Sequence, residues 1–185
     1  MNPNRVLVIG ASGAGKTAVA RRVADRLALP FVASDHFYWG PRWAPTTSEE
    51  VARLVAAVVN AKFWVLDGNF DQQRRVVWPR ADLIVWLDPS LTTIATNIIG
   101  RNVGWWARRK ATWSGNTMSL RRAWSGVHHA IGSVDPKRRS YPVWLGELGL
   151  CAVRLRSRRE IAAWLGSLPD VSLGPVEPVG SQGAG

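Results

Sequence analysis

The sequence predicts an α/β fold in which parallel strands alternate with helices. Short apolar runs rich in Val, Ile and Trp recur along the chain, and helical patterns separate them. Such runs are typical of parallel strands that are buried on both faces and joined by helical crossovers. A glycine-rich segment, 10–17, follows the first run and precedes a helical pattern. This order of strand, turn and helix is typical of a phosphate-binding loop.

Five segments are predicted to be buried strands. Each is a short apolar run, and polar or turn residues bound it. They span residues 5–10 (RVLVIG), 31–34, 63–68 (FWVLDG), 82–88 (DLIVWLD) and 151–156 (CAVRLR). Cys151, at the start of the fifth, is expected to be a small buried residue.

Four helices are predicted from the periodic segments. The first carries Val19, Val23 and Leu27 at helical spacing and ends before Pro30. The second is expected to begin at a cap formed by Thr46 or Thr47. The four span residues 16–29, 47–61, 90 to about 103, and 157–168.

The remaining segments have weaker patterns. In residues 104–142 the period is less clear and basic and tryptophan residues dominate, so we interpret them as helices that carry a mobile or surface element. Residues 169–185 are rich in Gly, Pro and Ser, which indicates a disordered tail. One domain is therefore expected over residues 1–168.

Composition is that of a folded, soluble chain. The 185 residues are enough for one core, and 46% apolar with 20% charged residues argues against wholesale disorder. No run reaches the roughly 18 apolar residues of a membrane span. The single cysteine agrees with a reducing compartment, so we expect a cytoplasmic protein with no membrane contact.

The charge favours phosphate-bearing partners. The formal net charge is +11, and from Arg101 to Arg159 the only acidic residues are Asp135 and Glu147. A basic half of this kind suits nucleotide phosphates or a nucleic-acid backbone, and charge alone does not choose between them.

Residues 10–17, Gly-Ala-Ser-Gly-Ala-Gly-Lys-Thr, fit the pattern G-x-x-x-x-G-K-[ST] in full. Glycines let the backbone N–H groups turn toward the phosphates, and the helix N-terminus adds its dipole. Lys16 is expected to reach the β- and γ-phosphates of ATP, and the Thr17 hydroxyl to hold Mg²⁺. The residues expected to contact the nucleotide are Gly10, Ser12, Gly13, Ala14, Gly15, Lys16 and Thr17.

Three carboxylates lie at or just after the carboxyl ends of predicted strands, where ligands bind in open α/β sheets. Asp35 follows the second and is a candidate for accepting a proton from a substrate hydroxyl or for orienting the partners of an acceptor phosphate. The alternative is a structural aspartate at an N-cap or turn. Asp67 and Asp88 end the third and fourth, and both could serve Mg²⁺. Asp67 is favoured because Gly68 allows close approach, whereas Pro89 suggests that Asp88 is a turn or cap.

Cationic and aromatic residues complete the candidate site. Arg101, Arg108 and Arg109 follow the fourth strand's helix and could stabilise charge on a transferring phosphoryl group. A solvated basic helix face is the competing interpretation. Trp39 and Trp43 could stack a planar acceptor, with Arg42 binding its phosphate.

These motifs together resemble the adenylate-kinase-like P-loop proteins of the DNA topology modulation, or FlaR-like, family. The resemblance rests on GASGAGKT, LPFVASDHFYWGPRWAP, WVLDGNF, ADLIVWLDP, an arginine near Arg101 and VRLRSRREIAAWL, in that order. It implies the nucleoside-monophosphate-kinase fold, a five-stranded parallel sheet in the order 2-3-1-4-5 with a lid after the fourth strand, at about 101–125.

The resemblance also implies a set of site residues. ATP and Mg²⁺ would lie at 10–17, the lid arginines would be Arg101, Arg108 and Arg109, and the acceptor would lie near 35–43 and 67–74. The acceptor contacts implied are Asp35, Trp39, Arg42, Trp43, Gly68, Asn69 and Arg74. Asn-Phe follows the Asp-Gly pair where adenylate kinase has Phe-Pro-Arg, which argues against AMP as the acceptor.

Two functions from different classes remain at this stage. The first is a small-molecule kinase that transfers the γ-phosphoryl group of ATP to a nucleotide, nucleoside or similar acceptor. The second is a nucleic-acid-associated, nucleotide-binding regulator, motivated by the basic half. A polynucleotide 5′-hydroxyl kinase would combine the two, but nothing in the sequence selects it.

Overall fold

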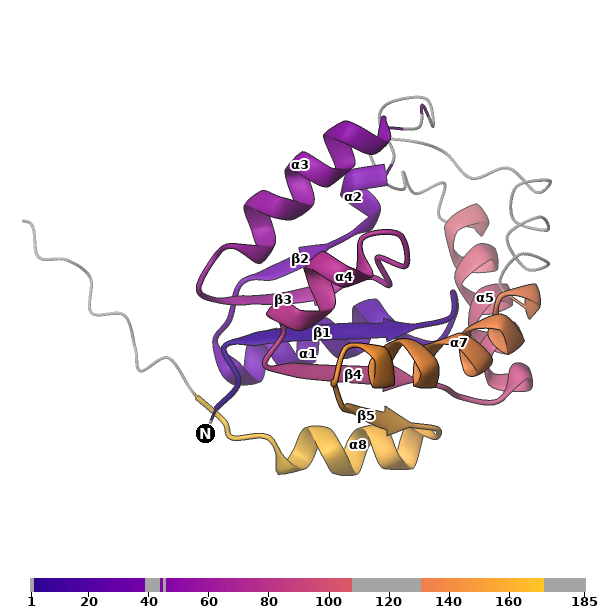
Figure 1. Cartoon of the computed structure of the whole chain (residues 1–185). Coiled ribbons are helices and arrows are strands. Elements are labelled where there is room, and N and C mark those ends of the chain that lie inside the picture. The colour runs from indigo at the N-terminus through magenta and orange to yellow at the C-terminus, as the bar shows by residue number, and fades with distance from the viewer. Residues whose placement is uncertain (1, 39–43, 45, 108–130, 172–185) are drawn as a thin grey trace, which may run out of the picture.

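The fold is a parallel sheet covered by helices on both faces (Figure 1). The computed structural model describes residues 2–38, 44, 46–107 and 131–171. The strands are β1 (Arg5–Gly10), β2 (Phe31–Ala33), β3 (Trp64–Asp67), β4 (Leu83–Leu87) and β5 (Ala152–Leu155). The helices are α1 (Lys16–Leu27), α2 (Asp35–Tyr38), α3 (Ser48–Val59), α4 (Arg74–Val77), the short 3-10 helix η2 (Trp78–Arg80), α5 (Leu91–Ala107), α7 (Val134–Glu147) and α8 (Arg158–Ser167).

The five strands lie in the order β2-β3-β1-β4-β5, and every neighbouring pair is parallel. The predicted sheet and strand order are therefore confirmed. Because β1 is central, its carboxyl end and the loop that follows it lie between the ends of β3 and β4. The register places Val8 beside Asp67 on one side and Gly10 beside Leu87 on the other.

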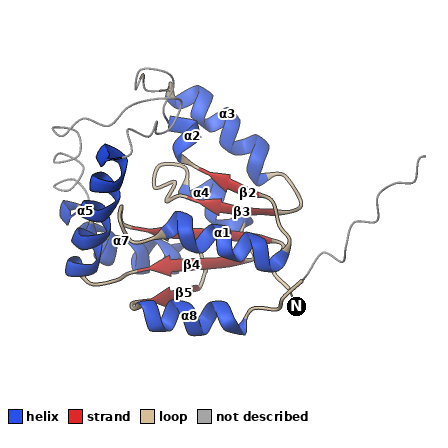
Figure 2. Ribbon diagram, turned by 180° about the vertical axis from the view of Figure 1, so that it is seen from behind, coloured by secondary structure: helices blue, strands red, loops and turns tan. Residues whose placement is uncertain are grey.

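Two apolar layers hold the helices against the sheet. Alternate strand side chains such as Leu7 and Leu66 pack on one face with α3, α4 and α7, and Val8 and Val85 pack on the other with α1 and α8. Figure 2, seen from behind, shows α1 and α8 on this second face. Alternation along strands buried on both faces is the pattern expected for a doubly covered parallel sheet.

The predicted helix boundaries hold to within a few residues. Helix α1 ends two residues early because Ala28 takes a left-handed conformation (φ 52°) that closes the helix. The Thr47 hydroxyl accepts a hydrogen bond from the Glu50 N–H, which confirms the cap of α3. Helix α5 is longer than predicted and continues to Ala107.

Helix α7 was not resolved as an element by the sequence pattern. Its buried residues, Val134, Tyr141 and Leu145, are few, and Pro142 lies inside it. The rest of the predicted lid, 108–125, lies outside the described residues, as does the tail beyond residue 171.

Two further predictions concern single features. Cys151 is exposed, so the expectation of a buried cysteine is wrong; it precedes β5, the edge strand of the sheet, where fewer neighbours cover it. Within the described ranges, no helix combines the length and the apolar character needed to cross a bilayer.

Candidate functional site

The loop after β1 has the backbone of a phosphate-binding loop. A Cβ at Gly10 would lie 2.5 Å from the Leu87 carbonyl oxygen, so only glycine fits between β1 and β4. Gly13 and Gly15 have left-handed φ values of 81° and 94°, and Gly15 directly precedes the first turn of α1. The loop therefore leads into a helix N-terminus whose first N–H groups have no partner within the helix, an arrangement suited to an anion.

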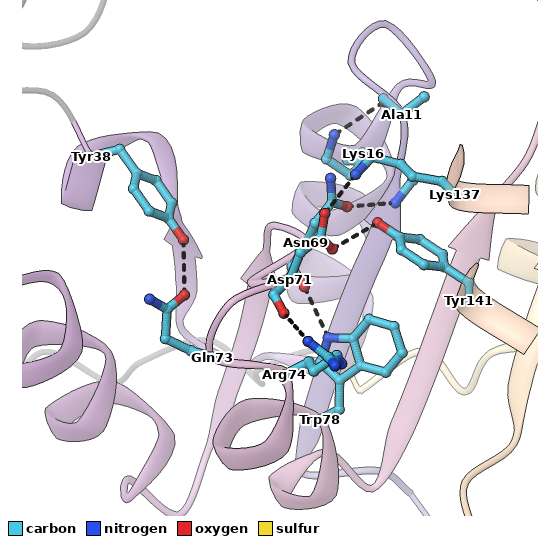
Figure 3. A network of polar contacts seen from close by, with 11 residues as sticks. Ala11, Lys16, Tyr38, Asn69, Asp71, Gln73, Arg74, Trp78, Lys137 and Tyr141 are labelled. Atoms are coloured by element: carbon cyan, nitrogen blue, oxygen red, sulfur yellow. Dashed lines mark hydrogen bonds and ion pairs between the residues drawn. The ribbon is translucent and has the colours of Figure 1, made fainter. Parts of the chain in front are cut away.

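Lys16 begins α1, and its ammonium lies over the loop. The Nζ atom donates a hydrogen bond to the carbonyl oxygen of Ala11 at 3.1 Å (Figure 3). Phosphate oxygens are stronger acceptors than a neutral carbonyl, so an ammonium at this place can turn toward them. The Lys16 side chain therefore lies next to the glycine-rich loop, and its contact with ATP stays a prediction.

Thr17 and Asp67 meet at the base of the loop. The Thr17 hydroxyl donates to Asp67 Oδ2 at 2.5 Å, and Asp67 is 4% exposed. In the described part of the chain, no donor reaches the buried Oδ1 atom of Asp67. A buried carboxylate oxygen without a partner costs free energy unless a cation or water satisfies it.

This pair fits Mg²⁺ bound with a nucleotide. Magnesium at such sites takes one or two protein oxygens and completes its shell with phosphates and water. The described residues hold no group of three or more His, Cys, Asp or Glu side chains that could form an all-protein metal site. Thr17 Oγ1 and Asp67 would be the protein contacts, as the sequence predicted.

Asp88, the competing carboxylate, is occupied elsewhere. Its Oδ1 accepts from Arg138 Nε at 2.7 Å, and its Oδ2 accepts from Arg154 Nη2 at 2.6 Å. The predicted role as a helix cap is wrong, because the hydroxyl of Ser90 accepts from the Thr93 N–H at the start of α5. Asp88 therefore joins the end of β4 to α7 and β5, whereas the orphaned oxygen favours Asp67 for metal.

The segment after β3 supports the phosphate-binding loop. Asn69 Oδ1 accepts from the Gly10 N–H at 2.8 Å, and its carbonyl accepts from Trp78 Nε1 at 2.9 Å. A Cβ at Gly68 would lie 2.3 Å from Ser34 Oγ, so this turn packs tightly on the end of β2. The side-chain oxygen of Asn69 thus fixes the end of β1, and the predicted contact of Asn69 with an acceptor stays a prediction.

A polar network next to the loop was missed by the sequence reasoning. The carboxylate of Asp71 pairs with Lys137 Nζ at 2.8 Å and accepts from the Tyr141 hydroxyl at 3.2 Å (Figure 3). Burial, and then the charge of Asp71, raise the pKa of Tyr141 well above its ordinary value, so this phenol stays a donor. Lys137 and Tyr141 come from α7, which carried no clear periodic signal.

Arg74 lies beside this network. One guanidinium nitrogen donates to the carbonyl oxygen of Asp71 at 2.9 Å, and the guanidinium carbon lies 4.2 Å from the centre of the Trp144 ring. Arg74 and Lys137 thus place two cations around the turn after β3. Both are close to the region predicted to receive the acceptor.

The structure places the other predicted residues as follows. Asp35 begins α2 directly after β2, and Arg101 lies in α5 with an exposed side chain. The orientation of the Asp35 side chain is not among the described features. Five predicted residues lie outside the described part of the chain: Trp39, Arg42, Trp43, Arg108 and Arg109.

Comparison with known proteins finds the same fold in solved structures of kinases. No protein-family model matches the chain, and no curated protein is significantly similar to it. The solved structures that resemble it include a gluconokinase from Sinorhizobium meliloti 1021, at 20% identity over 89% of this chain and 92% of that one, with a TM-score of 0.51.

Two shikimate kinases match with comparable coverage and TM-scores. The enzyme from Bacteroides thetaiotaomicron matches at 13% identity over 89% of this chain and 95% of that one, with a TM-score of 0.55. The enzyme from Acinetobacter baumannii, in complex with shikimate, matches at 17% identity over 90% of each chain, with a TM-score of 0.52. The TM-scores indicate a shared fold, and at these low identities the likeness shows nothing beyond the fold. The resemblance to the DNA topology modulation family stays a hypothesis.

Proposed function

We propose that the protein is an ATP-dependent small-molecule kinase. The observation that carries this proposal is the contact between Thr17 and Asp67 beneath a complete phosphate-binding loop, with one carboxylate oxygen left buried and without a donor. A hydroxyl, a carboxylate and an ammonium from Lys16 gather where the phosphate chain of a nucleotide would lie. Bound Mg²⁺ would neutralise the β- and γ-phosphates there.

Each residue has a part in phosphoryl transfer. The acceptor oxygen attacks the γ-phosphorus, the bond to the bridging oxygen breaks, and ADP leaves. The backbone N–H groups of residues 13–17 and the Lys16 ammonium hold the charged oxygens. Asp35, which follows β2 at the same edge of the sheet, is the proposed acceptor of the hydroxyl proton.

The acceptor would enter beside the turn after β3. Arg74 and Lys137 supply positive charge there, and Asn69 in the same turn is bonded to Gly10 of the loop. We assign Gly68 and Asn69 to acceptor contacts as well. We assign Arg101 to charge stabilisation from α5, together with Arg108 and Arg109. The resemblance to the DNA topology modulation family adds Trp39, Arg42 and Trp43 as acceptor contacts.

The nucleic-acid alternative gains no support from the described residues. Several cations of the basic C-terminal half are engaged within the fold: Lys137 with Asp71, and both Arg138 and Arg154 with Asp88. Part of the excess positive charge therefore neutralises carboxylates around the sheet end. A kinase explains the phosphate-binding loop and the Thr17–Asp67 pair, whereas a surface that binds the nucleic-acid backbone explains neither.

The test is ATP turnover against a panel of acceptors. The panel contains nucleosides, nucleoside monophosphates, a 5′-hydroxyl oligonucleotide, and gluconate and shikimate, for which the similar kinases are named. The proposal predicts ADP formation that depends on one acceptor class and on Mg²⁺ and is lost in Lys16→Ala. Turnover at the Lys16→Ala background with every acceptor would refute it.

A further inference from the structure

Helix α5 contacts the tip of the phosphate-binding loop directly. A Cβ at Gly13 would lie 2.5 Å from Ile98 Cγ1 and 3.0 Å from the Ile94 carbonyl oxygen. Ile94 and Ile98 also form a small buried cluster with Ala11 of the loop and Val134 of α7. The loop tip is therefore packed against one face of α5 with no room for a larger residue.

A polar contact lies on the same face. The Asn97 amide nitrogen donates to the carbonyl oxygen of Gly13 at 2.9 Å. Residues three and four apart lie on one side of a helix, so Ile94, Asn97 and Ile98 share that face. Gly13 has a left-handed φ of 81°, and the bond to Asn97 fixes the direction of its carbonyl toward α5.

Arg158 orients the Asn97 amide. Its Nη2 atom donates to Asn97 Oδ1 at 3.0 Å, and Arg158 is the first residue of α8. An amide has one acceptor and one donor end, and a guanidinium only donates. Arg158 therefore requires the oxygen of Asn97 to face α8, which leaves the NH₂ group to face Gly13.

We infer that Asn97 is a positioning residue for nucleotide phosphates, acting through Gly13 and oriented by Arg158. This inference rests on the proposed nucleotide binding and adds a residue that the sequence motif does not contain. The amide keeps the Gly13 peptide turned so that the loop N–H groups face the ligand. It also couples the loop to α5, on which Arg101 lies one turn beyond Asn97 on the same face.

The hydrogen bond between Asn97 and Gly13 also links the loop to Arg101, which is proposed to act in phosphoryl transfer. Helix α5 carries Arg101 and leads toward the predicted lid arginines. Movement of α5 relative to the loop would move this arginine relative to the phosphates. Asn97 fixes the position of α5 relative to the loop, and it can do so without contacting the ligand.

The test is titration calorimetry with two ligands, Mg·ATP and Mg·tripolyphosphate, on the wild type and four variants. Asn97→Ala removes the donor, and Arg158→Ala removes the orienting group from an exposed position. Thr96→Ala is the matched control, because its hydroxyl bonds the Thr92 and Thr93 carbonyls within α5. The fourth variant combines Asn97→Ala with Arg158→Ala.

Asn97→Ala is expected to weaken ATP and tripolyphosphate alike, by about tenfold, the loss typical of one hydrogen bond. Arg158→Ala should weaken both by about threefold, and the double variant should bind no worse than Asn97→Ala. Thr96→Ala should bind as the wild type does. Should Asn97→Ala fail to fold, Arg158→Ala still tests the inference through the equal loss for both ligands.

Three results with the variants, and one with the wild type, would overturn the inference. Unchanged affinity in both Asn97→Ala and Arg158→Ala would remove its basis. Weaker ATP binding with unchanged tripolyphosphate binding would mean that these residues contact the nucleoside instead. Losses that multiply in full in the double variant would mean that the two residues act separately. A wild type that binds neither ligand would refute the proposed function as well. A wild type that binds both ligands, with variants that bind equally well, would refute only the role of Asn97.

Discussion

The hydroxyl of Thr17 donates a 2.5 Å hydrogen bond to the carboxylate of Asp67, fifty residues further along the chain. The bond joins the first turn of α1 to the end of β3, and it leaves the second carboxylate oxygen buried without a donor. The two side chains form the base of the candidate nucleotide site.

Asp67→Asn should weaken ATP binding at least tenfold in the presence of Mg²⁺, because the amide removes the anion that would face the metal. In EDTA the variant should bind ATP as well as the wild type or better, since the carboxylate then repels the phosphates. Calorimetry in both buffers measures this. Asp25→Asn, at an exposed site on α1, controls for the loss of one charge. An equal loss in both buffers would contradict a role in metal binding.

Asp88 should be important for stability. Its side chain is 7% exposed and pairs with Arg138 and Arg154. Asp88→Asn should lower the free energy of unfolding by about 2 kcal/mol, because two charge-assisted bonds weaken and two guanidinium groups lose their counter-ion. Urea denaturation measures it. Asp135→Asn is the control, because that carboxylate lies 3.9 Å from Arg138 and is 65% exposed, and it should cost under about 0.5 kcal/mol.

Tyr141 should stay protonated in the native protein well above pH 10. The chain has two tyrosines, and burial raises the pKa of Tyr141. Native wild type and native Tyr141→Phe should therefore show equal tyrosinate absorbance up to about pH 11, and the wild type should exceed the variant only in denaturant. The folded form holds the proton more tightly, so stability is present below pH 10 and falls as pH rises further. An extra native transition near pH 10 would contradict the buried contact with Asp71.

The sequence identified the loop and its partner carboxylate because both obey local rules. Residues 10–17 carry their pattern in consecutive positions, and Asp67 ends an apolar strand at the edge of the sheet where ligands bind. Because neighbouring parallel strands have their carboxyl ends at the same edge of the sheet, the strand order alone brings the loop and Asp67 together. The choice of Asp67 over Asp88 also agrees with the buried, orphaned oxygen.

The contacts from α7 could not be predicted in the same way. Lys137 meets Asp71 across 66 residues, and Arg138 meets Asp88 across 50. Helix α7 has few buried residues and an internal proline, so its face toward the sheet could not be assigned. The contact between the Asn69 side-chain oxygen and the Gly10 N–H could not be predicted either, because it joins two segments that lie 59 residues apart in the sequence.

Asp82 should contribute stability that depends on pH. Its carboxylate accepts from the Arg5 side chain and from the N–H groups of Asn4 and Arg5, and the Arg5 guanidinium lowers the pKa of Asp82. A lowered pKa means that the stabilisation is present above about pH 4 and is lost as pH falls through the folded-state pKa. Asp82→Asn should therefore be about 1 kcal/mol less stable than wild type at pH 7.

The difference in urea midpoint between the wild type and Asp82→Asn should shrink below about pH 4. A difference that stays constant from pH 7 to pH 3 would show that the carboxylate charge is not the cause. Asp25→Asn again serves as the exposed control.

Binding of ATP to the glycine-rich loop is the claim on which the rest depends, and titration calorimetry of the wild type and Lys16→Ala with Mg·ATP measures it most directly. The wild type should bind one ATP per chain, and Lys16→Ala should bind about 10- to 100-fold more weakly, as expected for losing charge-assisted contacts to phosphate. Absence of binding heat in the wild type with either ATP or GTP, or equal affinity in the two proteins, would contradict the account.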